Sequence, residues 1–382
     1  MNTAPELRES KRQTIAKDIP LVETNRQKDQ LAYKIARGLA GVFNASQVSL
    51  AEAYINGLEV PDQILKALLN TYIPLIYQYL PSLMVPYEWL SEESDRLAEG
   101  SQELMEIQYN LPSGLFTTML GEGELVYPKY TMALWDNGAL NLEQAQRHML
   151  DDVIEKAEIR DGDTILDLGC GWGSAANYIL AKFPKASVTS LNLSHEQCEY
   201  IRRKTHDPQS YLSSDRFSLY EVDFNDATFE TKFDKIIAIG LFEHIGNLTQ
   251  AFQKLTSFLK ADGKVFLHII TTTLTQNITH PFLHKYIFPC ARAWNFDVIP
   301  KLNHDLKTIN QWYLNGSNYS KTLTHWLRSF DQNQEQIKAF NYGLDYDKFR
   351  RIWRLYLILC IALFDGCQGE ALGNGQYLMV HT

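Results

Sequence analysis

Two periods of apolar residues divide the chain. From Gln30 to Leu80 the apolar positions recur every three or four residues, which is the period of amphipathic helices. Beyond Arg160, short apolar runs alternate with segments of helical period, and this alternation is typical of a parallel sheet with crossover helices. The pattern therefore predicts an N-terminal helical domain followed by a doubly wound, mostly parallel α/β core.

The expected strands of the core are short apolar runs bounded by turn residues, and they cover 164–167, 186–192, 217–223, 233–240, 263–270 and 375–381. Helices are expected over 142–157, from 174 onward, and over 194–204, 248–259 and 348–364. Residues 271–345 interrupt the alternation with aromatic residues and prolines, so we interpret them as a cap insertion that selects the substrate. The predicted division is a loose leader (1–28), an N-terminal helical domain (29–108), a ligand-binding core (109–270), the cap (271–345) and a closing helix and strand (346–382).

The turn after the first expected strand is rich in glycine. Gly169, Gly171 and Gly173 permit backbone angles that other residues avoid, and they let a ligand approach the main chain closely. The spacing G-x-G-x-G is tighter than the dinucleotide fingerprint G-x-G-x-x-G, so a nicotinamide cofactor is not favoured. With Asp167 at the end of the strand, the turn predicts a different nucleotide-type cofactor, and the alternative is an ordinary structural turn.

Polar residues follow the next two strands. Ligands of parallel sheets bind beyond the carboxyl ends of the strands. Asn192 is positioned there to bond ribose hydroxyls, and Asp223 is positioned to accept a hydrogen bond from an adenine amino group. Each residue taken alone is equally typical of a turn or a helix cap. Their joint position favours an adenosyl ligand.

Four further residues are candidates for catalysis. Glu243 and His244 directly follow the strand 233–240, where they would orient and deprotonate an acceptor, although such a pair also begins helices. His268 emerges from an apolar strand, where a histidine is more usually a core residue. Tyr319 would donate a phenol hydrogen bond into the same cavity.

Composition excludes several classes of protein. A formal net charge of −9 argues against a nucleic-acid binder. The five cysteines contain no C-x-x-C pair, which argues against a disulfide framework and a structural zinc site, and no metal is expected. The polar N-terminus has no signal-peptide core, and no apolar run is long enough to span a bilayer. We therefore expect a cytoplasmic protein, with peripheral membrane contact and a homodimer left open.

Several motifs together resemble one family. Asp167-Leu-Gly-Cys-Gly-Trp-Gly173, Leu241-Phe-Glu-His-Ile-Gly246, Tyr109-Asn-Leu-Pro and Tyr286-Ile-Phe-Pro are similar to motifs of the cyclopropane-fatty-acid synthase superfamily of S-adenosylmethionine-dependent methyltransferases. This superfamily includes the coclaurine N-methyltransferase-like enzymes. The resemblance implies a class I (Rossmann-like) methyltransferase fold with S-adenosylmethionine bound at the glycine turn.

The resemblance also implies a set of cofactor-binding residues that covers the methionine, sulfonium, ribose and adenine parts of the ligand. They are Tyr130 and Thr131 over the methionine end, Asp167, Gly169, Gly171 and Gly173 at the glycine turn, Gly240 at the sulfonium, Asn192 and Gln197 at the ribose, and Asp223 and Phe224 at the adenine.

The two branches of the superfamily imply different acceptors. The cyclopropane synthases hold a bicarbonate base, and this chain matches them at Glu243, His268, Ile270 and Tyr319, while Met132 replaces their cysteine. The coclaurine-like enzymes use a Glu-His pair, matched by Glu243 and His244, but their additional upstream glutamate is Gly240 here.

The sequence is compatible with three functions. The leading expectation is methylation of a small apolar or aromatic amine. The alternative is methyl or methylene transfer to an unsaturated acyl chain with bicarbonate as the base. A non-catalytic cofactor-binding protein is the third.

Overall fold

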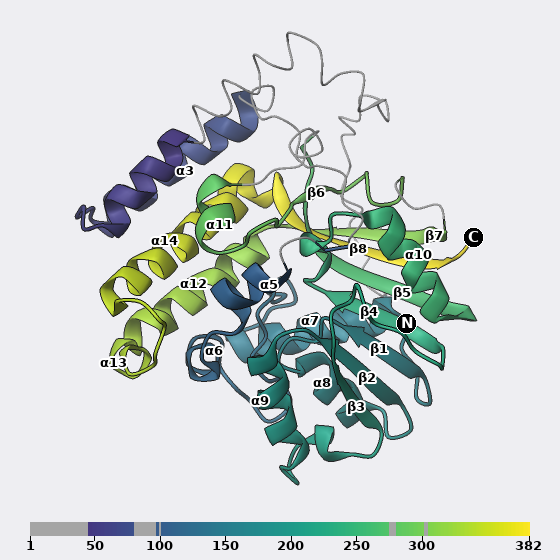
Figure 1. Cartoon of the computed structure of the whole chain (residues 1–382). Helices are drawn as coiled ribbons and strands as arrows, with labels where there is room; N and C mark the ends of the chain where they lie inside the picture. Colours follow the sequence, from purple (N-terminus) through teal and green to yellow (C-terminus); the bar gives the residue numbers. More distant parts are fainter. Residues whose placement is uncertain (1–44, 80–96, 99–100, 275–279, 302–304) are drawn as a thin grey trace, which may run out of the picture.

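The sheet and its helices are seen in a computed structural model that describes residues 45–79, 97–98, 101–274, 280–301 and 305–382 (Figure 1). The predicted leader, 1–28, lies outside the described residues. The order of the sheet is β3-β2-β1-β4-β5-β8-β7, and β6 pairs with β5 off this path. The strands are β1 (Thr164–Leu168), β2 (Ser187–Asn192), β3 (Phe217–Glu221), β4 (Phe233–Ile239), β5 (Leu259–Thr272), β6 (Trp294–Asn295), β7 (Leu306–Leu314) and β8 (Leu372–His381).

The direction of the strands brings the predicted ligand-binding ends together. Strands β1 to β5 pair in parallel, so their carboxyl ends meet at one edge of the sheet. Strand β8 is antiparallel to both β5 and β7, between which it lies. The doubly wound, mostly parallel core expected from the alternating pattern is confirmed.

Four helices flank the strands: α7 (Leu142–Lys156), α8 (Ser174–Lys182), α9 (His195–Thr205) and α10 (Leu248–Phe258). Three of them begin at polar side-chain caps, whereas α8 begins at Gly173. The side chain of Asn141 accepts a hydrogen bond from the amide of Gln144, and Ser194 and Asn247 cap α9 and α10 in the same way. The caps fix where each helix starts relative to the preceding strand, and so they fix the strand-end loops of the site.

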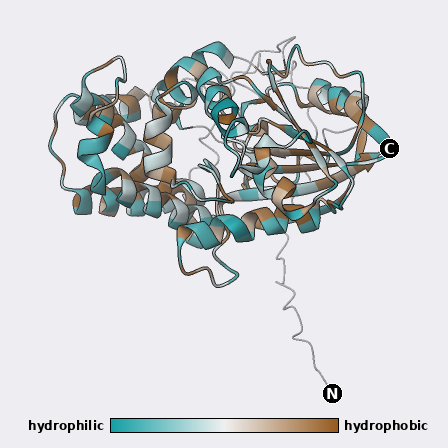
Figure 2. Ribbon diagram, turned by 90° about the horizontal axis from the view of Figure 1, so that it is seen from below, coloured by the Kyte–Doolittle hydropathy of each residue, from teal (hydrophilic) through white to brown (hydrophobic). Residues whose placement is uncertain are grey.

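A helical lobe lies beside the sheet (Figure 1). It contains a helix over 45–55, then α3 (Asp62–Tyr79), α5 (Ser101–Leu104), α6 (Ser113–Leu120), α11 (Pro281–Tyr286), α12 (Ser317–Gln332), α13 (Gln334–Lys338) and α14 (Tyr346–Asp365). Figure 2 shows that apolar residues are concentrated in the strands of the sheet. The buried faces of α3 and α14 meet where the Tyr77 hydroxyl donates to the Leu363 carbonyl at 3.2 Å.

One expectation about membranes needs correction. Tyr346–Gly369, which includes α14, is long and apolar enough to span a membrane by length and composition. Two thirds of the apolar 18-residue stretch within it is buried inside the fold, and Trp353 and Leu357 of α14 belong to the main apolar core. The segment therefore has the burial of a core helix in this structure.

The region 271–345 is more regular than the sequence predicts. It contains β7 at the edge of the sheet and the long helix α12. Strand β7 was not expected because it is an edge strand in which only Leu306 is fully buried, so its residues are not uniformly apolar. The closing strand, in contrast, is buried from Leu372 to Met379 and was recognised.

Candidate active site

The glycine turn after β1 has the geometry of a ligand cradle. Gly169, Gly171 and Gly173 have φ values of +73°, +56° and +81°, which other residues rarely adopt. A Cβ added at Gly171 would meet no heavy atom within 4 Å, so this part of the turn faces open space. Gly173 instead caps α8 and packs against Leu212 and Ile201, which is a structural role.

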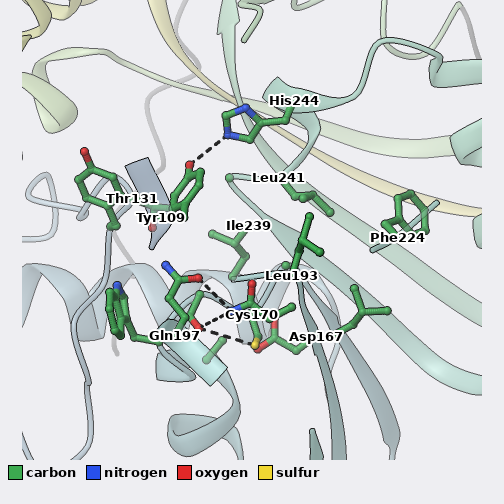
Figure 3. Close-up of a pocket in the computed structure, with 18 of the residues that line it drawn as sticks. Tyr109, Thr131, Asp167, Cys170, Leu193, Gln197, Phe224, Ile239, Leu241 and His244 are labelled. Carbon is green, nitrogen blue, oxygen red and sulfur yellow. Dashed lines mark hydrogen bonds between the residues drawn. The ribbon is translucent and has the colours of Figure 1, made fainter. Parts of the chain in front are cut away.

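A single pocket collects most of the predicted cofactor-binding residues. All of them except Gly173 line it: Tyr130, Thr131, Asp167, Gly169, Gly171, Asn192, Gln197, Asp223, Phe224 and Gly240 (Figure 3). Residues between 98 and 131 form one side of the wall, and the strand-end segments form most of the remainder. None of the described residues of the predicted cap, 271–345, lines this pocket. Tyr130 and Thr131 are in the lining, and their covering role stays a prediction.

Asp167 is a buried carboxylate at the floor of the pocket. The side chain is 2% exposed, and Oδ2 has no hydrogen-bond partner among the described residues. Burial raises the pKa of Asp167 to about 7. A cationic ligand group beside Oδ2 would relieve the cost of this isolated charge.

The amide of Asn192 is used largely by the protein itself. Its Nδ2 donates to the Gly171 carbonyl and to Gln197 Oε1, both at 2.9 Å, and its Oδ1 accepts from the Ser194 amide at 3.2 Å (Figure 3). These bonds give Asn192 a bracing role, and its ribose contact stays a prediction. Asn192 holds the glycine turn against the start of α9.

Asp223 also has a local structural partner. Its Oδ1 accepts hydrogen bonds from the backbone amide and the side-chain Nδ2 of Asn225, both at 2.8 Å. This is the turn geometry that the sequence left open as an alternative to an adenine contact. The residue nevertheless lines the pocket next to Phe224, so the turn presents both side chains at the predicted adenine end.

Glu243 lies in a short helix, Phe242–His244, directly after β4. It is 6% exposed, Oε1 accepts from the Ile270 amide at 2.7 Å, and Oε2 has no partner among the described residues. Burial raises the pKa of Glu243 to about 7, against the opposing effect of the Ile270 hydrogen bond. A carboxyl group with this pKa is suited to accept a proton near neutral pH.

His244 is held by an aromatic partner. Its Nε2 lies 3.1 Å from the Tyr109 hydroxyl (Figure 3), whereas Nδ1 is buried without a partner among the described residues. Burial, and secondly the charge of Arg292, lower the pKa of His244 to about 4. The imidazole is therefore neutral at pH 7, and it is a much weaker base than Glu243.

Aromatic rings surround the Glu-His pair. The ring centroid of Phe288 lies 6.0 Å from that of His244 and 5.7 Å from that of Tyr356. The Tyr130 hydroxyl donates to the Tyr356 hydroxyl at 2.9 Å. Tyr109 was recognised in sequence only as part of a motif over a ligand mouth; its direct contact with His244 required the fold.

Three of the four catalytic candidates, Glu243, His268 and Tyr319, do not line the cofactor pocket. Tyr319 packs with its ring centroid 4.3 Å from that of Phe364, and burial together with the charge of Glu243 raises the pKa of its hydroxyl. His268 is fully buried in β5, between Gln376 and Asn374 of β8. Of the four candidates only His244 lines the pocket.

The tautomer of His268 follows from its neighbours. Gln376 Oε1 accepts from Lys156 Nζ at 2.5 Å and Gln376 Nε2 donates to Asp152 Oδ2 at 2.7 Å, so the amide orientation is fixed. The same Nε2 lies 3.3 Å from His268 Nδ1, which must accept. The ring proton is then on Nε2. The nearest Asn374 atom, Nδ2 at 3.1 Å, is itself a donor, so this proton can bond to Asn374 only through Oδ1, which has no other partner among the described residues.

The comparisons with known proteins agree with this geometry. The family model for mycolic acid cyclopropane synthetase matches residues 98–370, and the chain belongs to this family. (S)-coclaurine N-methyltransferase of Papaver somniferum is 28% identical over 265 residues, which is 66% of this chain and 73% of that protein. Cyclopropane-fatty-acyl-phospholipid synthase of Escherichia coli K12 is 31% identical over 260 residues, which is 67% of this chain and 63% of that protein.

Solved structures show the same fold. Coclaurine N-methyltransferase bound to N-methylheliamine and SAH is similar with a TM-score of 0.75 at 22% identity, covering 88% of this chain and 99% of that chain. Mycolic acid cyclopropane synthase CmaA1 complexed with SAH and CTAB has a TM-score of 0.62 at 22% identity, covering 73% and 98%. The class I methyltransferase fold is confirmed, and the chain is an S-adenosylmethionine-dependent methyltransferase.

The residues present fit S-adenosylmethionine, the cofactor of this class. The cradle at Gly171 leaves space next to the main chain, and Asp167 Oδ2 offers an unpaired acceptor for the α-ammonium group. A residue that the sequence did not single out, Lys129, lines the same pocket and is 5% exposed. Only its burial, which the fold reveals, distinguishes it from an ordinary surface lysine.

Proposed function

We propose that this methyltransferase transfers the methyl group of S-adenosylmethionine to the nitrogen of a small apolar or aromatic amine. The observation that carries the proposal is the state of the groups expected to hold bicarbonate. The Ile270 amide, a donor that would otherwise be able to hold an anion, already donates to Glu243 Oε1 at 2.7 Å. These two groups are paired with each other instead of facing an open anion site.

His268 supports the same choice. Both of its ring nitrogens face side chains of β8, and burial above all lowers its pKa well below the ordinary range, so the ring is neutral. A neutral imidazole offers an anion no charge. Alkene methylation needs a base to remove a proton from a carbocation, whereas an amine carries its own lone pair, so the pairing of Glu243 with Ile270 and the neutral state of His268 support the amine acceptor.

The chemistry of an amine acceptor needs little from the protein beyond position and one base. The cofactor supplies an electrophilic methyl group on a sulfonium. The amine lone pair forms the new N–C bond, and the electrons of the broken S–C bond stay on sulfur. An aliphatic ammonium has a pKa near that of lysine, about 10, so the nitrogen must lose a proton before it can attack.

Glu243 is the better of the two candidate bases. Its pKa of about 7 leaves it substantially ionised at neutral pH, and the unpartnered Oε2 is available to a proton. His244, with a pKa of about 4, serves instead as a neutral hydrogen-bonding group held by Tyr109. In this role Glu243 takes the proton and His244 orients the acceptor nitrogen.

The aromatic wall suits the charge that develops. Rings of Tyr109, Phe288 and Tyr356 lie next to His244 or next to each other. Aromatic faces stabilise a nearby cation by about 0.5–2 kcal/mol each. They would stabilise the nitrogen as it becomes positive, and they would select an apolar body for the amine.

For the cofactor we propose the contacts that the pocket offers. Gly169 and Gly171 would approach its methionine part, Asp167 its ammonium group, and Gln197 its ribose. Phe224 and Asp223 would flank the adenine. Tyr130 and Thr131 would cover the methionine end, and Gly240, whose added Cβ would lie 2.8 Å from Thr131 Cγ2, would leave room at the sulfonium.

An acceptor screen tests this proposal. Purified protein is incubated with methyl-labelled S-adenosylmethionine and either secondary aromatic amines or vesicles of unsaturated phospholipid, with and without added bicarbonate. We expect labelled N-methyl product that does not depend on bicarbonate, and a loss of turnover in Glu243→Gln but not in the exposed control Glu155→Gln. Labelled cyclopropane or branched acyl chains would support the lipid alternative. If no acceptor becomes labelled, the result would support a non-catalytic cofactor-binding protein.

A further inference from the structure

A buried lysine in the cofactor pocket has no acidic partner. Lys129 Nζ donates to Thr131 Oγ1 at 2.6 Å and to the Met132 carbonyl at 2.5 Å, and both partners are neutral. None of the ion pairs among the described residues includes Lys129. Burial lowers its pKa to about 7, with no charged group to oppose the effect. Isolated buried charges are costly, so such a lysine points to a ligand that supplies the missing anion.

The same pocket contains a buried acidic residue without a basic partner in the described part of the chain. Asp167 is also buried, its Oδ2 lacks a partner among the described residues, and both residues belong to the lining of this pocket. The wall therefore carries one potential cation and one potential anion, each without a counter-ion. A zwitterionic ligand group would pair with both at once.

We propose that Lys129 binds the α-carboxylate of the methionine part of S-adenosylmethionine, while Asp167 binds its α-ammonium. The inference rests on the proposed function, because it takes S-adenosylmethionine as the ligand of this pocket. An ammonium group has three N–H donors, and the two protein contacts of Lys129 leave one for the ligand. The resulting bond is charge-assisted, which makes it stronger than a neutral hydrogen bond.

The assignment also has a consequence for protons. Pairing with a carboxylate raises the pKa of Lys129, so binding takes up a proton there near pH 7. Pairing with an ammonium lowers the pKa of Asp167, so binding releases a proton there. The other titratable group whose pKa responds to the charge of Lys129 is His268, which is already neutral. In the wild-type protein the two changes oppose each other.

Calorimetry with two ligands tests the assignment. S-adenosylhomocysteine carries the zwitterion, and 5′-methylthioadenosine carries the nucleoside and sulfur without it. We expect Lys129→Met to weaken binding of S-adenosylhomocysteine roughly 10- to 100-fold while leaving methylthioadenosine binding unchanged. Lys129→Arg should keep most of the affinity, and the exposed control Lys185→Met should bind like wild type.

Proton linkage gives a second readout at pH 7, from binding enthalpies in buffers of different ionisation enthalpy. We expect net proton release in Lys129→Met and net uptake in Asp167→Asn. Unchanged affinity of Lys129→Met for S-adenosylhomocysteine, or an equal loss for both ligands, would overturn the inference. If wild-type protein binds neither ligand, the proposed function itself fails.

Discussion

Replacing Glu243 with Gln should raise stability and abolish activity in the same variant. The unfolded chain releases the Glu243 proton near 4.5, whereas the folded chain keeps it until about 7. Between these values the folded state binds more protons, so stability falls as pH rises, and the loss is complete above about pH 7. At 1.36 kcal/mol per pH unit, the difference corresponds to about 3 kcal/mol.

Glutamine removes this cost and keeps the local structure. Its Oε1 still accepts from the Ile270 amide, which Glu243 Oε1 bonds at 2.7 Å, and its side chain cannot ionise. Glu243→Gln should therefore unfold at a higher temperature than wild type at pH 8, with a much smaller difference at pH 5. The exposed control Glu155→Gln should show no such change.

Two assays check the reasoning: thermal unfolding at both pH values, and the pH dependence of methyl transfer. The wild-type kcat/KM should rise through about pH 7 as Glu243 ionises, and the variant should be inactive throughout. A variant that is no more stable than wild type at pH 8, or one that keeps its turnover, would refute the role of Glu243 as an ionisable buried base.

Three further variants probe other parts of the site. Tyr109→Phe removes the hydrogen bond to His244 and should lower kcat roughly five- to tenfold, as measured by initial rates, with S-adenosylhomocysteine affinity unchanged by calorimetry. Gly171→Ala and Gly162→Ala both add a Cβ at positive φ with no atom within 4 Å, so both should lose about 1 kcal/mol of stability, but only Gly171→Ala should lose cofactor binding. His268→Ala should lower the free energy of unfolding by about 2–4 kcal/mol in denaturant titrations, because it leaves a cavity and unpaired amides, while cofactor affinity stays near wild type.

Much of the fold follows from local patterns in the sequence. Strand β1 and helix α7 were predicted within a residue because their apolar periods are strong and their ends carry a cap or a glycine turn. Strand β7 was missed because an edge strand is only partly buried. The packing of the other lobe helices against α14 was also not predicted, since periodicity does not indicate which element a helix packs against.

The site was predicted less completely, for a physical reason. Residues at the ends of parallel strands could be assigned to one pocket because topology alone brings those ends together. The burial of Lys129, the contact between Tyr109 and His244, and the partners of His268 depend on packing between distant segments, which no local pattern encodes. The same packing contacts support the proposal of an amine acceptor over a lipid acceptor.

The acceptor atom can be determined in one competition. The protein is given equal concentrations of an aromatic secondary amine and an unsaturated phospholipid, with methyl-labelled S-adenosylmethionine in carbon dioxide-free buffer. The products are then separated and identified by mass spectrometry. The account predicts that the label is on the amine nitrogen. Label in the acyl chain, appearing only when bicarbonate is restored, would contradict it.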